Sequence, residues 1–298
     1  KYCVSVNYYK RKQRLAAFSF INPYIVQSRS DKELLLCLQQ DDYPVLMEGI
    51  HCTYLLKKGL LKGHKTFVRL HNVEYKYYRQ LAKHESNILK KIYYLHESIL
   101  LKKYERSIAN KAVFWPVSID DTKLYKSKFD AHKIDFLPVF LPWKEISAKP
   151  GRGSFCLYHG NLEINENEKA ADWLLNNVFD TLEIPFVIAG RNPSLPLQTL
   201  AHAHMHTCMT VNPTDTDMQD MISKAQVNIL PSFNKTGVKL KLMNAMFNGR
   251  HCLVNEAGIE GTGLEGLCHV AGSAEDFKKK IASLFQQEFT EAQLQQRK

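Results

Sequence analysis

The sequence predicts an α/β fold of two domains, each with a parallel sheet covered by helices. Three observations support this prediction: the 298-residue length, the alternation of short apolar strand patterns with helical patterns in both halves, and a break rich in Pro and Gly at 148–153. A chain of this length is long enough for two domains of ordinary size. Strands that alternate with helices are typical of parallel sheets, because each helix returns the chain to the same end of the sheet. We therefore expect domains at 1–147 and 148–298.

The first half contains strand patterns followed by helical ones. Short apolar runs predict strands at 43–49, 65–70, 112–117 and 134–137, and a 3.6-residue apolar period predicts helices at 30–38 and 74–110. The opening residues 1–6 also have a strand pattern, with no initiator methionine before them. A domain of this type should begin with more strands than these, so we expect the first domain to be incomplete at its N-terminus.

The second half repeats the alternation more regularly. Strands are expected at 154–159, 186–189, 209–211, 227–231, 251–254 and 268–270, with helices at 167–178, 218–224, 239–247 and 274–285. Six short parallel strands with intervening helices predict a doubly wound domain. Such a domain binds its ligand outside the carboxyl ends of its strands.

Composition narrows the class of partner. The formal net charge of +10 favours anionic partners, namely nucleic acid, an acidic membrane surface or phosphorylated small molecules. Only this charge favours nucleic-acid binding. The sequence has no helix-turn-helix, zinc-finger or RNA-binding aromatic motif, so we do not expect a nucleic-acid partner. The seven cysteines are scattered and never spaced as CxxC, which indicates reduced thiols in a cytoplasmic protein.

Candidate ligand contacts follow the strands of the second half. Gly160 and Asn161 come after the first of these strands, and Gly190 and Arg191 after the second. Glycine after a strand suits a tight turn and a close backbone approach by a ligand, and an arginine there can bind two phosphate oxygens or form a surface salt bridge. Asn212 follows a third strand. These positions predict a phosphate-binding edge of the sheet.

The stretch TGVKLKLMNAMFNG, residues 236–249, places Lys239 and Lys241 where a helix begins. The unpaired backbone N–H groups of a helix start favour an anion, and lysines there add positive charge. The alternative is an amphipathic helix with a solvated basic edge. The strand expected at 227–231 ends just before this stretch and is the fourth whose end meets this edge, so the phosphate interpretation is favoured.

Several segments together resemble the retaining glycosyltransferases of the GT-B fold, in particular glycosyltransferase family 4, also called glycosyl transferases group 1. The segments are FVRLHNVEYKYY, YHGNL with ENEKAADWLL, PFVIAGRNP, MTVNPTDTDMQDMISKAQVNILPSF, TGVKLKLMNAMFNGRHCLVN and GIEGTGLEGLCHVAGSAEDFKKKI. Their order and spacing match over nearly the whole chain. The resemblance implies two Rossmann-like domains facing a cleft, of which the first is N-terminally truncated here.

The resemblance also implies an activity: transfer of a hexosyl unit from a UDP- or GDP-linked sugar to a glycan or lipid-linked acceptor, with retention of configuration and no cofactor or metal. Such an enzyme would serve bacterial polysaccharide biosynthesis in the cytoplasm, or at the inner face of the membrane. The catalytic residues would be His71, Arg191 and Lys241, although His71 could equally pack at a strand end. The donor-binding positions would be Gly160, Asn161, Gly190, Asn212, Thr236, Gly237, Val238, Lys239 and Asn244.

One departure from the family puts the activity in doubt. Family members usually carry a glutamate that contacts the nucleotide ribose just before an Ala-Met pair, and this chain has Asn244 there. An amide can still form a hydrogen bond with a hydroxyl. The alternative function is therefore a catalytically degenerate GT-B protein that binds a nucleotide sugar or acts as a scaffold.

Three further patterns are considered as candidate sites. The basic and aromatic segment 87–104 could rest on an anionic membrane surface or could be a solvated helix face. The histidines at 202, 204 and 206 lack the spacing of a zinc site. Asp215 and Asp217 have the spacing of a metal-binding acid pair, but at a helix start they more simply cap its N–H groups.

Overall fold

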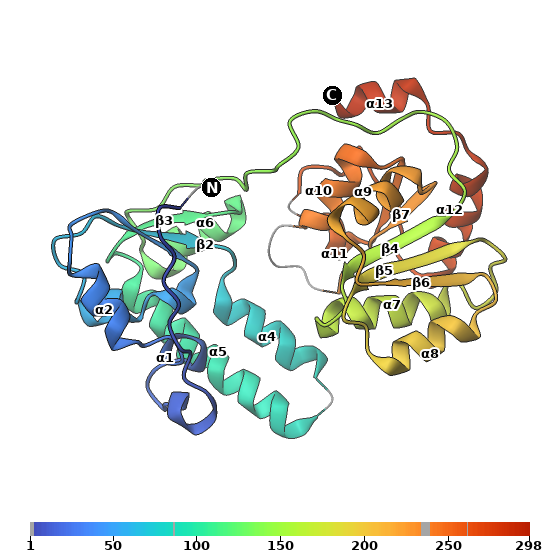
Figure 1. Cartoon of the computed structure of the whole chain (residues 1–298). Helices are drawn as coiled ribbons and strands as arrows, with labels where there is room; N and C mark the ends of the chain where they lie inside the picture. The colour runs from blue at the N-terminus through green and yellow to red at the C-terminus, as the bar shows by residue number, and fades with distance from the viewer. Residues whose placement is uncertain (1–2, 86, 234–238, 261) are drawn as a thin grey trace. The chain divides into compact units, whose positions relative to one another are not determined.

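The computed structural model describes residues 3–85, 87–233, 239–260 and 262–298. The described chain forms two compact units, and the first ends at Val139 (Figure 1). The sequence placed the boundary later, between 147 and 148. The intervening segment joins the second unit because Ser147 N donates to the Phe247 carbonyl at 2.8 Å and Ala148 is buried beside Phe289.

The first unit is built on a three-stranded parallel sheet with the order β1-β2-β3. Its strands are β1 (Val45–Glu48), β2 (Thr66–Leu70) and β3 (Val113–Pro116), as the sequence predicted. The strand expected at 134–137 is reduced to one parallel bridge between Phe114 and Ile134. The strand pattern at 1–6 was wrong for its described part, because Val4 and Val6 lie exposed and pair with no neighbour in the sheet.

Helices surround this sheet. They are the 3-10 turns η1 (Arg14–Ala17) and η2 (Ile50–Cys52) and the α-helices α1 (Tyr24–Gln27), α2 (Lys32–Leu38), α3 (Tyr54–Lys58), α4 (Glu74–His84), α5 (Ile88–Ile108) and α6 (Ile119–Phe129). The single helix predicted at 74–110 is therefore two helices. Glu85 is extended, and the side chain of Asn87 accepts from Leu89 N and Lys90 N to begin α5.

A buried carboxylate holds α4 and α5 together. Glu105 of α5 accepts hydrogen bonds from Glu74 N at 3.0 Å and from Tyr75 N at 3.2 Å, so it caps the start of α4. The hydroxyl of Tyr125 donates to the same carboxylate at 2.9 Å. Burial raises the pKa of Glu105 to about 8, although the hydrogen bonds act in the opposite direction.

The second unit is built on a six-stranded, entirely parallel sheet with the order β6-β5-β4-β7-β8-β9. The strands are β4 (Cys156–Asn161), β5 (Phe186–Arg191), β6 (Thr207–Val211), β7 (Val227–Ile229), β8 (His251–Val254) and β9 (His269–Val270). All six were predicted. The strand order reverses between β4 and β7, which is where a doubly wound sheet opens a crevice for its ligand.

Helices cover both faces of this sheet (Figure 1). They are α7 (Asn165–Asn177), α8 (Leu195–Ala203), α9 (Asp215–Lys224), α10 (Leu240–Asn248), α11 (Glu256–Ile259), α12 (Ala274–Gln286) and α13 (Glu291–Arg297). One core cluster packs α7, α8 and α12 on the sheet, and two others pack α9, α10 and α11. Among the described residues, no helix combines the length and apolar character needed to cross a membrane.

Candidate functional site

Lys241 lies where the strand order of the second unit reverses. It stands in the first turn of α10, and its Nζ is 3.2 Å from Asn167 Oδ1 on α7. The same ammonium is 3.5 Å from the hydroxyl of Tyr158 on β4 and 4.9 Å from the centre of its ring. The consecutive elements β4 and α7 therefore meet the distant helix α10 around one cation.

Burial has a strong effect on the lysines of this site. It lowers the pKa of Lys241 to about 8, an effect that Lys239 increases and Glu166 opposes. Burial also lowers the pKa of Lys239 to about 8. Both ammonium groups have lost part of their hydration, so an anionic ligand would restore their preference for the charged form.

Asn167 is held in one orientation by its neighbours. Its Nδ2 donates to the carbonyl of Asn161 at 2.9 Å, which leaves its Oδ1 to face Lys241. The Tyr158 hydroxyl donates to the Asn167 carbonyl at 2.8 Å. A Cβ on Gly160 would lie 3.3 Å from Asn167 Cγ, so glycine makes room for this amide.

The glycines expected to end strands instead lie within them. β4 runs through Gly160 to Asn161, and β5 runs through Gly190 to Arg191. The tight turns predicted there were wrong. Gly190 is required by its neighbour strand, because a Cβ on it would come within 2.1 Å of the Gly160 carbonyl oxygen.

Arg191 and Asn212 lie on the same carboxyl edge but away from the strand reversal. Arg191 ends β5, one strand beyond β4, and pairs with Asp215 at 3.2 Å, with both side chains largely exposed. Asn212 follows the edge strand β6, and its Oδ1 accepts from Asn192 N at 2.8 Å. Arg191 therefore contacts the start of α9, and Asn212 contacts the backbone just after β5.

Asn244 contacts its own helix. Its Oδ1 accepts from Asn248 Nδ2 at 2.8 Å, and Asn248 Oδ1 accepts from the Ser147 hydroxyl at 2.6 Å. The amide that replaces the family glutamate is therefore part of a local hydrogen-bond chain. The predicted positions Thr236, Gly237 and Val238 lie outside the described residues.

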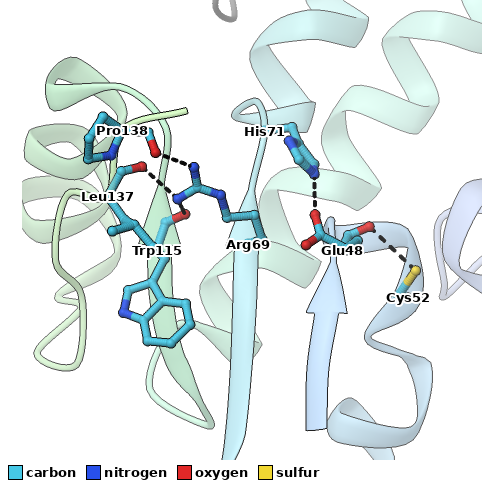
Figure 2. Close-up of polar contacts among 7 residues, drawn as sticks. All are labelled: Glu48, Cys52, Arg69, His71, Trp115, Leu137 and Pro138. Atoms are coloured by element: carbon cyan, nitrogen blue, oxygen red, sulfur yellow. Dashed lines mark hydrogen bonds and ion pairs between the residues drawn. The ribbon is translucent and has the colours of Figure 1, made fainter. Parts of the chain in front are cut away.

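His71 belongs to the first unit, where it forms an ion-pair contact. Its Nε2 lies 2.8 Å from Glu48 Oε2, and each side chain is about half exposed, at 49% and 57%. Figure 2 shows that the two residues meet at the ends of β2 and β1. A histidine oriented by a carboxylate can hold or transfer a proton.

The side chain of Arg69, two positions before His71, points away from this pair and toward residues 137 and 138 (Figure 2). Its guanidinium donates to the carbonyls of Leu137 at 2.6 Å and Pro138 at 2.8 Å. Nearby, burial lowers the pKa of His51 to about 4 and raises that of Glu74 to about 7. Burial therefore disfavours the charged form of both groups.

Three residues of the second unit were not predicted from the sequence. Tyr158 and Asn167 contact Lys241, and His159 Nε2 is buried with no hydrogen-bond partner among the described atoms. Burial, with Lys241 nearby, lowers the pKa of His159 to about 3. Each stands in or beside a segment quoted above, but no spacing motif marks them.

The acids and histidines considered for metal binding have other placements. Asp217 Oδ2 accepts from Thr214 N and the Thr214 hydroxyl in a capping box that begins α9. His202 lies in the last turn of α8 and His204 caps it. Over residues 3–85, 87–233, 239–260 and 262–298, no group of three or more His, Cys, Asp or Glu side chains is placed to hold a metal ion.

Comparison with known proteins finds a family match within the second unit. Residues 154–287 match the family described as "Glycosyl transferases group 1". The chain is also 29% identical over 251 residues to an uncharacterized 44.6 kDa protein in the cps region of Klebsiella pneumoniae. This match covers 81% of the chain but only 64% of that relative's length.

Several solved structures share the fold. A crystal structure of TarM matches with a TM-score of 0.57 at 10% identity, over 88% of this chain and 56% of that one. A variant of S. aureus TarM in complex with fondaparinux, alpha-GlcNAc-glycerol and UDP gives a TM-score of 0.59 at 11% identity, over 85% and 51%. A glycosyltransferase from Rickettsia africae gives 0.55 at 12% identity, over 88% and 71%. This likeness supports the predicted GT-B fold, with two α/β units built on parallel sheets.

Proposed function

We propose that the protein is a glycosyltransferase that takes a hexosyl unit from a nucleotide sugar. The observation that carries this proposal is the placement of Lys241 at the strand reversal of a unit that matches a glycosyltransferase family. The leaving nucleoside diphosphate gains negative charge as the sugar departs. A fixed, partly dehydrated ammonium stabilises that charge better than a solvated one, because its surroundings need not reorganise.

The proposal assigns roles to the other residues of the site. Lys239 adds a second cation, and Asn167 with Tyr158 orients Lys241. His71, held by Glu48, would act near the transferred sugar on the acceptor side. We further propose retention of the anomeric configuration, a UDP- or GDP-linked donor, a glycan or lipid-linked acceptor, and catalysis without a divalent metal.

Asn244 supports a second candidate, a degenerate member that binds a nucleotide sugar without turnover. The side chain is already bonded to Asn248, and an amide lacks the two acceptor oxygens that a carboxylate offers to ribose hydroxyls. This candidate predicts nucleotide binding with no donor hydrolysis and no transfer.

Calorimetry with UDP and GDP, followed by a hydrolysis assay on the matching nucleotide sugars, tests both candidates. Glycosyl transfer requires saturable binding of one nucleoside diphosphate and release of that nucleotide from its sugar. NMR of the released sugar reports whether the anomeric configuration is retained. Failure of both UDP and GDP to bind would refute both candidates, whereas binding without hydrolysis would favour the degenerate one.

A further inference from the structure

Two arginines and two histidines gather where β1 and β2 of the first unit end. His51 stands in η2, just after β1, and His71 follows β2. Arg29 follows α1, which packs against η2. Burial lowers the pKa of His51, and repulsion from Arg29 and from the exposed Arg11 adds to this effect. The proposed reaction uses His71 but gives no role to the other three residues.

The imidazole of His51 is held against the backbone at the end of β1. Gly49 has a positive φ of 96°. A Cβ on this glycine would lie 2.7 Å from His51 Cε1 and 2.9 Å from His51 Nδ1, so glycine is needed for the ring to fold back. The ring forms no hydrogen bond with any residue that the structure describes. A ring N–H of His51 is therefore available to a ligand.

In the described chain, neither arginine forms an ion pair with an acid. Arg29 Nη1 donates to the Ile25 carbonyl at 2.8 Å, and Arg11 Nε donates to the Ser28 hydroxyl at 3.1 Å. Burial lowers the pKa of the half-buried Arg29, and the charge of Arg11 lowers it further. A partly dehydrated guanidinium beside a second one is unfavourable unless an anion offsets the two charges.

The acids near these arginines offset little of the charge. Glu74, at the start of α4, is the carboxyl group that acts on Arg29. Burial raises the pKa of Glu74 to about 7, although Arg29 opposes this, so roughly half of the molecules carry it uncharged at neutral pH. Glu48 is already in contact with His71. An uncharged Glu74 can itself donate a hydrogen bond to an oxyanion.

We propose that Arg29, Arg11 and His51 bind an acidic group of the acceptor, a carboxylate or a phosphate carried by its sugar. This inference rests on the proposed function, because it names the class of acceptor. Arg29 would form the charged hydrogen bonds, and a ring N–H of His51 would donate to a further oxygen. The anion would offset the repulsion between the two arginines. His71, at the end of the neighbouring strand, already has a role on the acceptor side in the proposed reaction.

NMR titration with small sugars tests the class of acceptor without donor or turnover. Methyl glucuronide carries a carboxylate and glucose 6-phosphate a phosphate, and both should shift the Nε–H signal of Arg29 and the ring signals of His51. Methyl glucoside, which is neutral, should bind much more weakly. The acidic sugar that binds more tightly identifies which oxyanion the site takes. Binding of methyl glucoside as tight as that of both acidic sugars would overturn the proposal, and so would equally tight binding of inorganic phosphate, because the site would then hold a free anion.

Arginine variants test whether these residues form the site. Arg29→Gln should weaken binding of the acidic sugars about tenfold or more, because it removes hydrogen bonds to a charged group. Arg11→Gln should weaken it less, since this side chain is exposed. Arg79→Gln, at an exposed position of α4 in the same unit, is the matched control and should bind like the parent. If circular dichroism shows that Arg29→Gln unfolds, Arg11→Gln decides alone, because an exposed arginine can be replaced without opening the core. Unchanged binding in every folded variant of Arg29 and Arg11 would overturn the proposal.

Calorimetry with UDP and GDP on the same variants separates this inference from the proposed function. Arg29→Gln should bind the nucleotide as tightly as the parent does, because the nucleotide site around Lys241 belongs to the second unit. Nucleotide binding and sugar transfer without any preference for acidic sugars would overturn this inference alone. Failure of both nucleotides to bind the parent would refute the proposed function, whatever the acidic sugars do.

Discussion

The ammonium of Lys241 lies 3.2 Å from the side-chain oxygen of Asn167, and this contact joins α10 to α7 across the end of β4. Asn167 cannot turn its amide without losing the hydrogen bond from its Nδ2 to the Asn161 carbonyl. The lysine is therefore positioned before any ligand arrives. A cation held in advance binds a diphosphate without paying the entropy of ordering a long side chain.

Replacing Lys241 by alanine should weaken binding of UDP, or of GDP if that is the nucleotide bound, by about 1.5–3 kcal/mol, the usual range for a hydrogen bond to a charged group. Calorimetry measures this change directly. Lys279→Ala, at an exposed position of α12, is the matched control and should leave the affinity unchanged. If Lys241→Ala binds as tightly as the parent, Lys241 does not contact the nucleotide.

The affinity for the nucleotide should fall as the pH rises from about 7 to about 9, because Lys241 and Lys239 lose their protons near pH 8. Binding should also take up protons, which calorimetry in two buffers of different ionisation enthalpy detects. The stability of the free protein should change with pH in the opposite direction to the affinity. The folded state binds fewer protons here than the unfolded state, so this contribution to stability rises with pH.

Lys241→Arg is the control for this pH dependence. Arginine stays charged throughout the range, so any remaining slope belongs to Lys239. An affinity that stays constant across the range in the parent protein would contradict the role of both lysines.

The sheet of the second unit was predictable because each strand is a short apolar run separated from the next by a helical pattern. Where β4 and β5 end was not predictable. Glycine usually signals a turn, but here Gly160 and Gly190 pair across the two strands, and the close approach that demands Gly190 arises only in the folded sheet. Local sequence does not encode a contact between neighbouring strands.

In the first unit and in the site, too, some features could not be predicted from local sequence. An apolar period continues through the break between α4 and α5, so the capping role of Asn87 was not distinguishable from an ordinary helical position. Lys241 was predictable from its place after β7. Asn167 was not, because its contact with Lys241 depends on how α7 packs beside β4.

Asn244→Glu should strengthen binding of the nucleotide about tenfold, because a carboxylate accepts hydrogen bonds from hydroxyls more strongly than an amide does. The change should also break the link to Asn248, at a modest cost in melting temperature. Calorimetry and a hydrolysis assay on the same variant check the effect, with Asn244→Gln as the control that adds length without charge. Weaker nucleotide binding by the glutamate variant would show that the nucleotide site of this chain requires the amide of Asn244.

His71→Ala should lower turnover about a hundredfold while leaving the affinity for UDP or GDP nearly unchanged, since proton transfer by a placed side chain contributes on this scale. Glu48→Gln should have a smaller effect in the same direction, because it weakens the contact that orients the imidazole. The measurement is kcat with saturating donor, beside calorimetry. His132→Ala, whose ring lies near the exposed Asp130 of the same unit, is the control. A loss of nucleotide affinity in His71→Ala equal to its loss of turnover would contradict an acceptor-side role.

Turnover should survive excess EDTA. Hard divalent cations need several oxygen ligands, often from paired carboxylates, and the paired acids Asp215 and Asp217 already have partners. Asp215 pairs with Arg191, and Asp217 closes the capping box with Thr214, whose hydrogen bonds lower the pKa of that carboxyl. Lys241 and Lys239 would offset the charge of the departing diphosphate instead. The assay compares initial rates with and without the chelator, and then with added Mn²⁺. Activity that EDTA abolishes and Mn²⁺ restores would refute the metal-free mechanism, and a parallel loss in Asp215→Asn or Asp217→Asn would identify the ligands.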